Sequence, residues 1–113
     1  SALRKAEYQK ENVENNINLA VQSSLLNMFS SIQSYESAKL SLEYAEEFWQ
    51  QRNTRFKNNL LSANEMLDAD VIINNARTQQ ISAIYNILRA KSALMQLINS
   101  ESDEELQQLF KNE

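Results

Sequence analysis

The sequence contains no glycine and no proline among its 113 residues. Average usage would place about eight glycines and six prolines in a chain of this length. Because the tight turns of sheet proteins depend on these two residues, their absence argues against an all-β or an α/β domain. Long uninterrupted helices need neither residue, so the sequence predicts an all-α fold with one domain at most.

Cysteine and histidine are absent as well. Without cysteine the chain has no disulfides and no thiol chemistry. Without histidine the usual pairs of a nucleophile and a base cannot be built. A helical-bundle metalloenzyme would also need inward Glu-x-x-His motifs. We therefore expect no enzymatic activity, no cofactor and no metal site.

The chain also lacks a block of basic residues and a long hydrophobic run. Its net charge is −4 and its pI is about 4.9. Nucleic-acid binding requires a lysine and arginine stripe, so no nucleic-acid partner is expected. Runs such as "LLNMF" are too short to span a bilayer. A hydrophobic content of 42% nevertheless argues against disorder.

A first long helix is predicted over about residues 3–57, with a length of roughly 80 Å. Its hydrophobic residues recur mostly at steps of three, four or seven, which is typical of a coiled-coil seam. A second group of hydrophobic residues widens this stripe and indicates contact with more than one neighbour. The stripe is Val13, Ile17, Val21, Met28, Ile32, Tyr35, Leu42, Ala45 and Trp49.

A second helix is predicted over about residues 63–98. One stripe of this segment alternates steps of four and three, so we expect it to face the first helix. That stripe is Leu67, Val71, Asn74, Thr78, Ile81, Tyr85, Leu88, Ser92 and Met95. Ile73, Ile84, Ile87, Leu94 and Leu97 form another stripe beside it. Trp49 is interpreted as a core residue of the seam.

The turn between the two helices is predicted at residues 58–62. Ser62 and Glu65 have the spacing of a capping box, in which Glu65 reaches back to the N-cap residue. Leu61 and Met66 are placed for a hydrophobic staple around this cap. Asn58 and Asn59 can close the first helix, because asparagine is the best residue other than glycine for the left-handed conformation at a helix end. The sequence therefore predicts a long antiparallel helical hairpin, coiled-coil-like, with a tight tip.

A second break is predicted at Asn99–Ser100. Ser102 and Glu105 repeat the capping-box spacing, so a short C-terminal helical tail is expected within residues 101–113. With these boundaries the first arm has about 55 residues and the second about 36. The N-terminal part of the first arm would then lack a partner within the chain.

The tip carries a possible acidic site. Glu65 and Asp68 lie three positions apart, on one face of the second helix, whereas Asp70 points elsewhere. Paired carboxylates can bind a hard cation. Acidic residues in the first turn of a helix also interact favourably with its dipole, which is the more common reason for their presence there. The spacing leaves both interpretations open.

The order of residues around the turn resembles the C-terminal repeat of TolC-like outer-membrane efflux proteins. That family shows an arginine or small residue, an aromatic, Gly-Leu, Ser or Thr, an acidic residue and Leu-Asp-Ala. The matching positions here are Arg55, Phe56, Asn59-Leu60, Ser62, Glu65 and Leu67-Asp68-Ala69. Further on, "IYNILRAKSALMQL" is similar to the family's Tyr-Asn segment and its Lys-Ser-Ala-Leu-Gly-x-Leu ending.

Three features depart from the family pattern. The tip glycine is replaced by Asn59, and the glycine near the end of the return helix by Met95. The β-strands of the membrane barrel are absent from the sequence. The resemblance therefore implies a helical part of a larger channel.

The resemblance also implies a function. Intact family members are homotrimers with an outer-membrane barrel and a periplasmic helical tunnel. The hairpin tips close the tunnel entrance and contact a periplasmic adaptor protein, which works with an inner-membrane pump. Glu65 and Asp68 would be gate residues at the entrance. The tip and adaptor contact would be Arg55, Asn59, Leu60 and Ser62.

A second hypothesis belongs to another class. A free-standing coiled-coil interaction module or scaffold would show the same heptads and the same polar seam residues. The full-length sequence would separate the two hypotheses, because the channel requires flanking strands, a signal peptide and a second related repeat.

Overall fold

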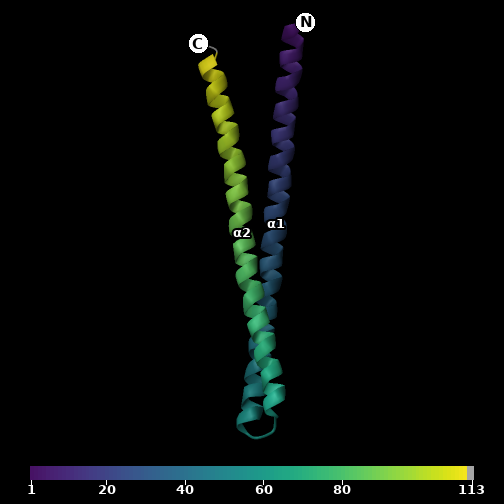
Figure 1. Ribbon diagram of the computed structural model, residues 1–113, viewed down its shortest axis with the longest axis vertical. Coiled ribbons are helices and arrows are strands. Elements are labelled where there is room, and N and C mark those ends of the chain that lie inside the picture. Colours follow the sequence, from purple (N-terminus) through teal and green to yellow (C-terminus); the bar gives the residue numbers. More distant parts are fainter. Residues whose placement is uncertain (112–113) are drawn as a thin grey trace. The chain divides into compact units, whose positions relative to one another are not determined.

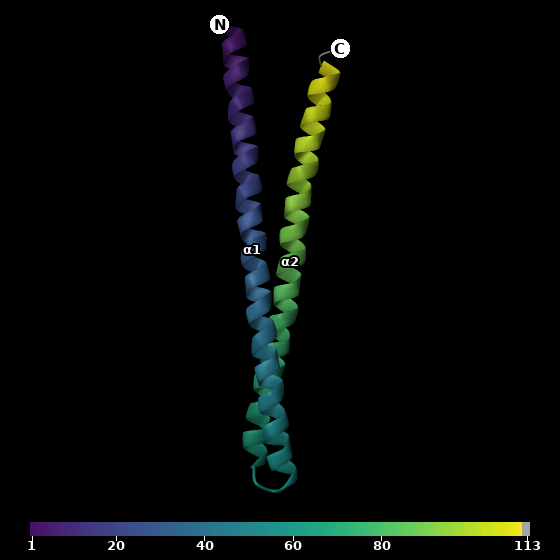
Figure 2. The same ribbon diagram turned by 180° about the vertical axis from the view of Figure 1, so that it is seen from behind.

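The structure is a computed structural model that describes residues 1–111, and this part of the chain contains two α-helices and no strand. Helix α1 spans Ala2–Lys57 and helix α2 spans Ala63–Lys111. In both views the two helices lie side by side and antiparallel next to the linker (Figures 1 and 2). The predicted all-α helical hairpin is therefore confirmed.

The chain divides into two compact units. We call Ser30–Ile87 the tip unit, and Ser1–Phe29 with Leu88–Glu113 the terminal unit. The tip unit holds all the buried side chains except that of Ala90. In the terminal unit, by contrast, every residue from 1 to 16 is exposed. The hydrophobic core of this hairpin therefore lies near the linker.

No helix among residues 1–111 combines the length and hydrophobicity that crossing a membrane requires.

Each helix has one stripe of shielded residues at strictly alternating steps of three and four. We call these two stripes together the inner seam. On α1 the stripe is Ile17, Val21, Ser24, Met28, Ser31, Tyr35, Ala38, Leu42, Ala45 and Trp49. On α2 it is Met66, Ala69, Ile73, Ala76, Gln80, Ala83, Ile87, Ala90, Leu94, Leu97 and Glu101. This periodicity is that of a left-handed coiled coil.

Alanine fills the centre of the inner seam. Six of the eight buried residues are alanines, and those on α2 recur at every seventh position: Ala69, Ala76, Ala83 and Ala90. In the tip unit Ala45, Ile73 and Ala76 form a buried cluster against which Leu42 and Trp49 pack. Small side chains permit a short distance between helix axes, which typically measures about 8–10 Å. The alanines therefore permit a close approach of the two backbones, with larger side chains flanking the contact.

The predicted stripe of α1 is largely correct. Seven of its nine residues are shielded, whereas Val13 is 44% exposed and Ile32 is 41% exposed. Trp49 lies in the seam, as expected, and is half-buried.

The predicted seam of α2 is wrong. Its hydrophobic members are exposed to between 54% and 61% of their surface, because they lie on the side of α2 away from the inner seam. We call this predicted stripe the outer stripe; it contains Leu67, Val71, Asn74, Thr78, Ile81, Tyr85, Leu88, Ser92 and Met95. The alternative stripe contributes Ile73, Ile87, Leu94 and Leu97 to the inner seam, but Ile84 is 42% exposed. Alanine occupies contact positions where larger hydrophobic residues were expected. Hydrophobicity alone therefore predicted the wrong side of α2.

The predicted break at Asn99–Ser100 is also wrong. Helix α2 continues without interruption to Lys111, so the expected short tail is its last part, and residues 112–113 lie outside the described range. Asn and Ser cost only a fraction of a kcal/mol each in a helix interior, about 0.5 relative to alanine. A break would instead leave several backbone groups without helical partners. The arms are therefore nearly equal, at 56 and 49 residues.

Helix α2 extends far enough to line a groove with the N-terminal part of α1, whereas the unequal arms predicted no partner there. In the terminal unit a shallow groove is lined by Gln9 and Val13 of α1 and by Glu104 and Gln108 of α2. The side chains from 1 to 16 remain exposed all the same. This partner therefore adds little hydrophobic burial.

The alanine seam predicts an unusual response to a larger side chain. Ala76 is 7% exposed, so Ala76→Leu should lower the free energy of unfolding by about 1–3 kcal/mol because it overpacks the contact. Urea unfolding followed by circular dichroism would measure this change. The neighbouring exposed position provides the control, and Asn75→Leu should change the stability by less than about 0.5 kcal/mol. Equal stability of the two variants would contradict close packing at Ala76.

Candidate functional site: the hairpin tip

Helix α1 ends in a Schellman motif. The amide of Leu60 donates to the Arg55 carbonyl at 2.9 Å, and the amide of Asn59 donates to the Phe56 carbonyl at 3.1 Å. Asn59 has a φ of 57°, which is the left-handed conformation that this motif needs. Asparagine reaches that region more readily than other residues with a side chain. The predicted role of Asn59 is confirmed.

Helix α2 begins with the predicted capping box. The amide of Glu65 donates to the Ser62 hydroxyl at 3.2 Å, and the amide of Ser62 donates to the Glu65 carboxylate at 3.4 Å. Leu61 before the cap is half-buried and Met66 after it is buried, as a hydrophobic staple requires. The linker of residues 58–62 is thus fixed at both ends without glycine or proline.

The two acidic residues proposed for the entrance have different local environments. The Glu65 carboxylate is engaged in the capping box, whereas Asp68 is exposed one turn further along α2. Among residues 1–111, no group of three or more acidic side chains is placed to hold a metal ion. The Asp68 carboxylate is thus exposed and lies outside the capping box.

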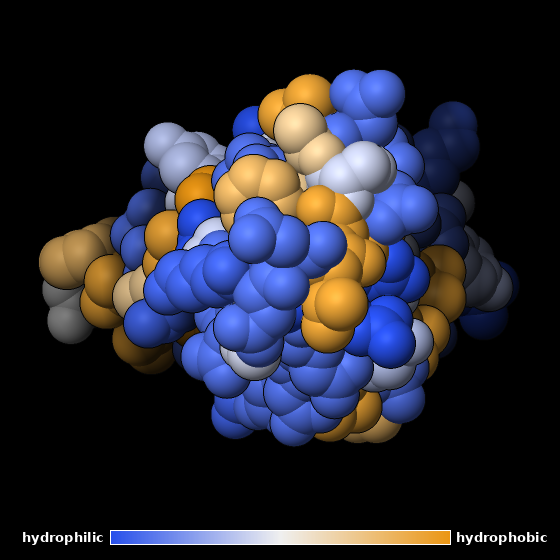
Figure 3. Space-filling model, turned by 90° about the horizontal axis from the view of Figure 1, so that it is seen from below, coloured by the Kyte–Doolittle hydropathy of each residue, from blue (hydrophilic) through white to orange (hydrophobic). Residues whose placement is uncertain are grey.

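The residues proposed for adaptor contact lie on the surface of the tip. Leu60 is 73% exposed. Arg55 lines a shallow surface groove of about 550 Å³ together with Phe48, Gln51, Arg52 and Thr54. The Arg52 guanidinium lies over the Phe48 ring, 4.8 Å from its centroid, in a cation–π contact. Seen from the linker end, the surface is mostly hydrophilic, with hydrophobic patches between the polar groups (Figure 3).

A hydrogen bond between the helices lies beside the tip, and the sequence did not predict it. The Trp49 indole Nε1–H donates to Oδ1 of Asp70 at 2.6 Å, and both residues are half-buried. The expectation that Asp70 points away from Glu65 and Asp68 is thereby confirmed. The signal available in the sequence was the single tryptophan placed at a seam position, since a buried indole N–H usually finds an acceptor.

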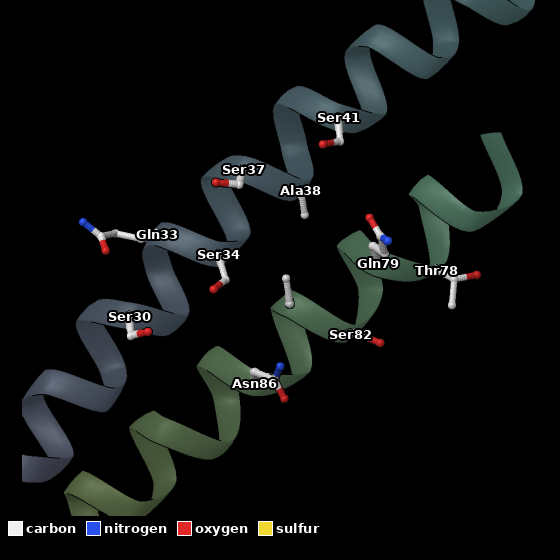
Figure 4. A pocket seen from close by; sticks show the side chains of 11 residues that line it. Ser30, Gln33, Ser34, Ser37, Ala38, Ser41, Thr78, Gln79, Ser82 and Asn86 are labelled. Atoms are coloured by element: carbon white, nitrogen blue, oxygen red, sulfur yellow. The ribbon is translucent and has the colours of Figure 1, made fainter. Parts of the chain in front are cut away.

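A groove of uncharged polar side chains lies further along the tip unit. It has a volume of about 520 Å³, and Ala38 and Ala83 contribute to its lining. Its other residues carry hydroxyl or amide groups and come from both helices (Figure 4). They are Ser30, Gln33, Ser34, Ser37, Ser41, Thr78, Gln79, Ser82 and Asn86. No charged residue lines this groove.

No family model, curated protein or solved structure matches this chain.

The left-handed position at the tip leads to a prediction. Asn59→Val should lower the free energy of unfolding by about 1–2 kcal/mol, because a β-branched residue is strained at positive φ. Asn59→Gly should equal the original chain or exceed its stability by up to about 1 kcal/mol. Chemical denaturation would measure both values. Asn58 is the matched control, since its φ is not positive and Asn58→Val should have a smaller effect.

Proposed function

We propose that this chain is a tunnel-forming helical hairpin of a TolC-like outer-membrane efflux channel. In this proposal the segment lies in the periplasm and three copies of the intact protein form the channel, whose barrel is outside this sequence. A periplasmic adaptor and an inner-membrane pump are its partners. The hairpin lines a passage for exported solutes and makes or breaks no bond.

The observation that carries the proposal is the outer stripe of α2. Helix α2 has two seams with coiled-coil spacing, the inner seam toward α1 and the outer stripe on its other side. Ile81 is 61% exposed and Leu88 is 55% exposed, although both are strongly hydrophobic. A helix with two such seams fits a position between two neighbours. In the wall of a helical tunnel each helix has a neighbour on both sides.

Helix α1 supports the same arrangement from its own exposed side. Leu19, Leu26 and Phe29 are exposed to more than 60%, as are Leu40 and Tyr44 further along. Fully burying one such side chain contributes about 1.5–3 kcal/mol. Two hydrophobic edges on one hairpin allow copies or repeats to associate edge to edge.

The tip supports the proposal through the order of its residues. Asn59 takes the backbone conformation of the family's tip glycine, and Ser62 and Glu65 form the helix start that follows. Asp68 then presents an exposed carboxylate one turn further on. Three copies of such a carboxylate around one axis would favour cations and repel one another unless hydrated or paired.

The free-standing interaction module remains a second candidate, because the outer stripe also fits another helical protein as partner. The two candidates are separated by the identity of that partner. The tunnel requires hairpins of the same type, whereas a scaffold requires a different chain.

Self-association tests the edge-to-edge arrangement. We expect the chain to form oligomers at concentrations of about 10–100 μM, a range typical of standard-size interfaces of modest affinity. Ile81→Glu should weaken this association at least about tenfold, because it places a charge in the outer stripe. Sedimentation equilibrium would give the constants, and circular dichroism would verify helicity.

Ser82→Glu is the matched control, since it adds the same charge at the next residue, in the polar groove. It should leave the association constant within about threefold. A chain that stays monomeric, or a variant Ile81→Glu that associates like the original, would contradict the proposal.

Cation block tests the entrance residues in the intact channel. Asp68→Asn should lower the affinity for blocking divalent cations and reduce cation selectivity, because it removes the exposed charge. Planar-bilayer recordings would measure conductance and block. Glu65→Gln should also reduce block while its amide oxygen keeps the cap by accepting from the Ser62 amide, and Glu36→Gln, which removes an exposed charge of α1 outside the entrance pair, is the control. Unchanged block in a double variant Glu65→Ala with Asp68→Ala would remove both residues from the entrance role.

A further inference from the structure

The hydrogen bond from Trp49 to Asp70 connects the two helices within the tip unit. It joins residues 21 positions apart, from α1 to α2. The side-chain bonds of Thr54, Ser62, Glu65 and Thr78 are local instead, with partners three or four residues away. This bond therefore constrains the two helices relative to each other within the tip unit.

The Trp49–Asp70 bond adds a directional constraint on helix rotation that the alanine contacts do not supply. Ala69, 1% exposed, directly precedes Asp70, and Ala45 lies one turn before Trp49. A methyl group makes few dispersion contacts, so the alanines resist rotation of α2 less than the larger buried neighbours Met66 and Ile73 do. A hydrogen bond is directional, and one to a charged acceptor is stronger than one between neutral groups.

Rotation of α2 would move Asp68. Asp68 lies two residues before Asp70 in the same continuous helix, so the two side chains are about 200° apart around the axis. With Asp70 held toward α1, Asp68 is held on the far, exposed side. Any rotation that releases Asp70 changes the direction of Asp68 by the same angle.

We propose that Trp49 and Asp70 are positioning residues that fix the orientation of Asp68 at the tip. This inference deepens the proposed function and rests on it for the role of Asp68 at the entrance. The pair acts as a directional lock: while the bond is formed, the first turns of α2 have one orientation. When the bond breaks, the alanine seam allows α2 to rotate locally.

The composition of the chain permits a direct test. It contains no cysteine, so Asp68→Cys creates a single site for a nitroxide spin label. It contains one tryptophan, so the intrinsic emission reports on Trp49 alone. In this labelled background we would compare Asp70→Ala, Asp70→Asn and Trp49→Phe. Electron paramagnetic resonance measures the label's mobility, and fluorescence measures the exposure of the indole.

Loss of the bond should increase the mobile population of the label about tenfold, the equilibrium equivalent of a hydrogen bond to a charged group. Asp70→Ala and Trp49→Phe should both show this increase, and Asp70→Ala should also shift the tryptophan emission to longer wavelength. Asp70→Asn should restore most of the order, because its amide oxygen can accept from the indole N–H.

Ala83→Gly controls for a general loss of stability. It weakens the inner seam at a buried position, 6% exposed, without touching the polar pair. Its label spectrum should match that of the original chain. If Ala83→Gly mobilises the label as much as Asp70→Ala, or if Asp70→Asn fails to restore order, the positioning role is overturned.

The intact channel separates this inference from the proposed function. With Asp68 in place, Asp70→Ala should reduce cation block and Asp70→Asn should preserve it. If the label experiment succeeds and no cation-selective channel exists, the proposed function fails while the lock stands. If the channel is blocked through Asp68 but Asp70→Ala leaves both block and label unchanged, the lock alone fails.

Discussion

The close contact of two helices through alanine determines most other features of this hairpin. Ala69, Ala76 and Ala83 recur at one position of the heptad, with Ala38 and Ala45 on α1. Because these side chains are small, other residues must supply hydrophobic burial (the bulk of the contact) and must fix the relative rotation of the helices (its direction). Leu42 and Trp49 supply the bulk, and the Trp49–Asp70 hydrogen bond supplies the direction. A seam of larger residues would make this polar pair unnecessary.

The same constraint explains why so much hydrophobic surface is exposed. Burial contributes about 25 cal/mol for each Å² of apolar surface, so an alanine contributes far less than a leucine or isoleucine. In this chain Leu67, Ile81 and Leu88 remain outside, on the outer stripe. The inner seam thus alternates alanine with larger residues such as Met66 and Ile73, while further large residues lie on the outer stripe. In the proposed channel, association through the outer stripe would bury this exposed surface.

The sequence predicted the two helices and their connection better than it predicted which side of each helix contacts the other. The absence of glycine and proline and the spacing of Ser62 and Glu65 were sufficient for two helices and their connection, because caps depend on local chemistry. The orientation of α2 was mispredicted, since hydrophobicity ranks alanine below leucine and valine although alanine allows closer contact. The available signal was the recurrence of alanine at every seventh position from Ala69 to Ala90. The Trp49–Asp70 contact depends on how the helices are rotated, which no local pattern contains.

The three acidic residues after the linker follow one another along α2 but have different local environments. Glu65 closes the helix start, and Asp70 binds α1 through Trp49, so both carboxylates have structural partners. Asp68 lies between them in sequence and is directed away from the helix pair. The hydrogen bonds of Glu65 and Asp70 therefore fix the helix backbone on both sides of Asp68. In the proposed channel this arrangement would present the Asp68 carboxylate of each hairpin at a fixed position, where three copies would favour cations.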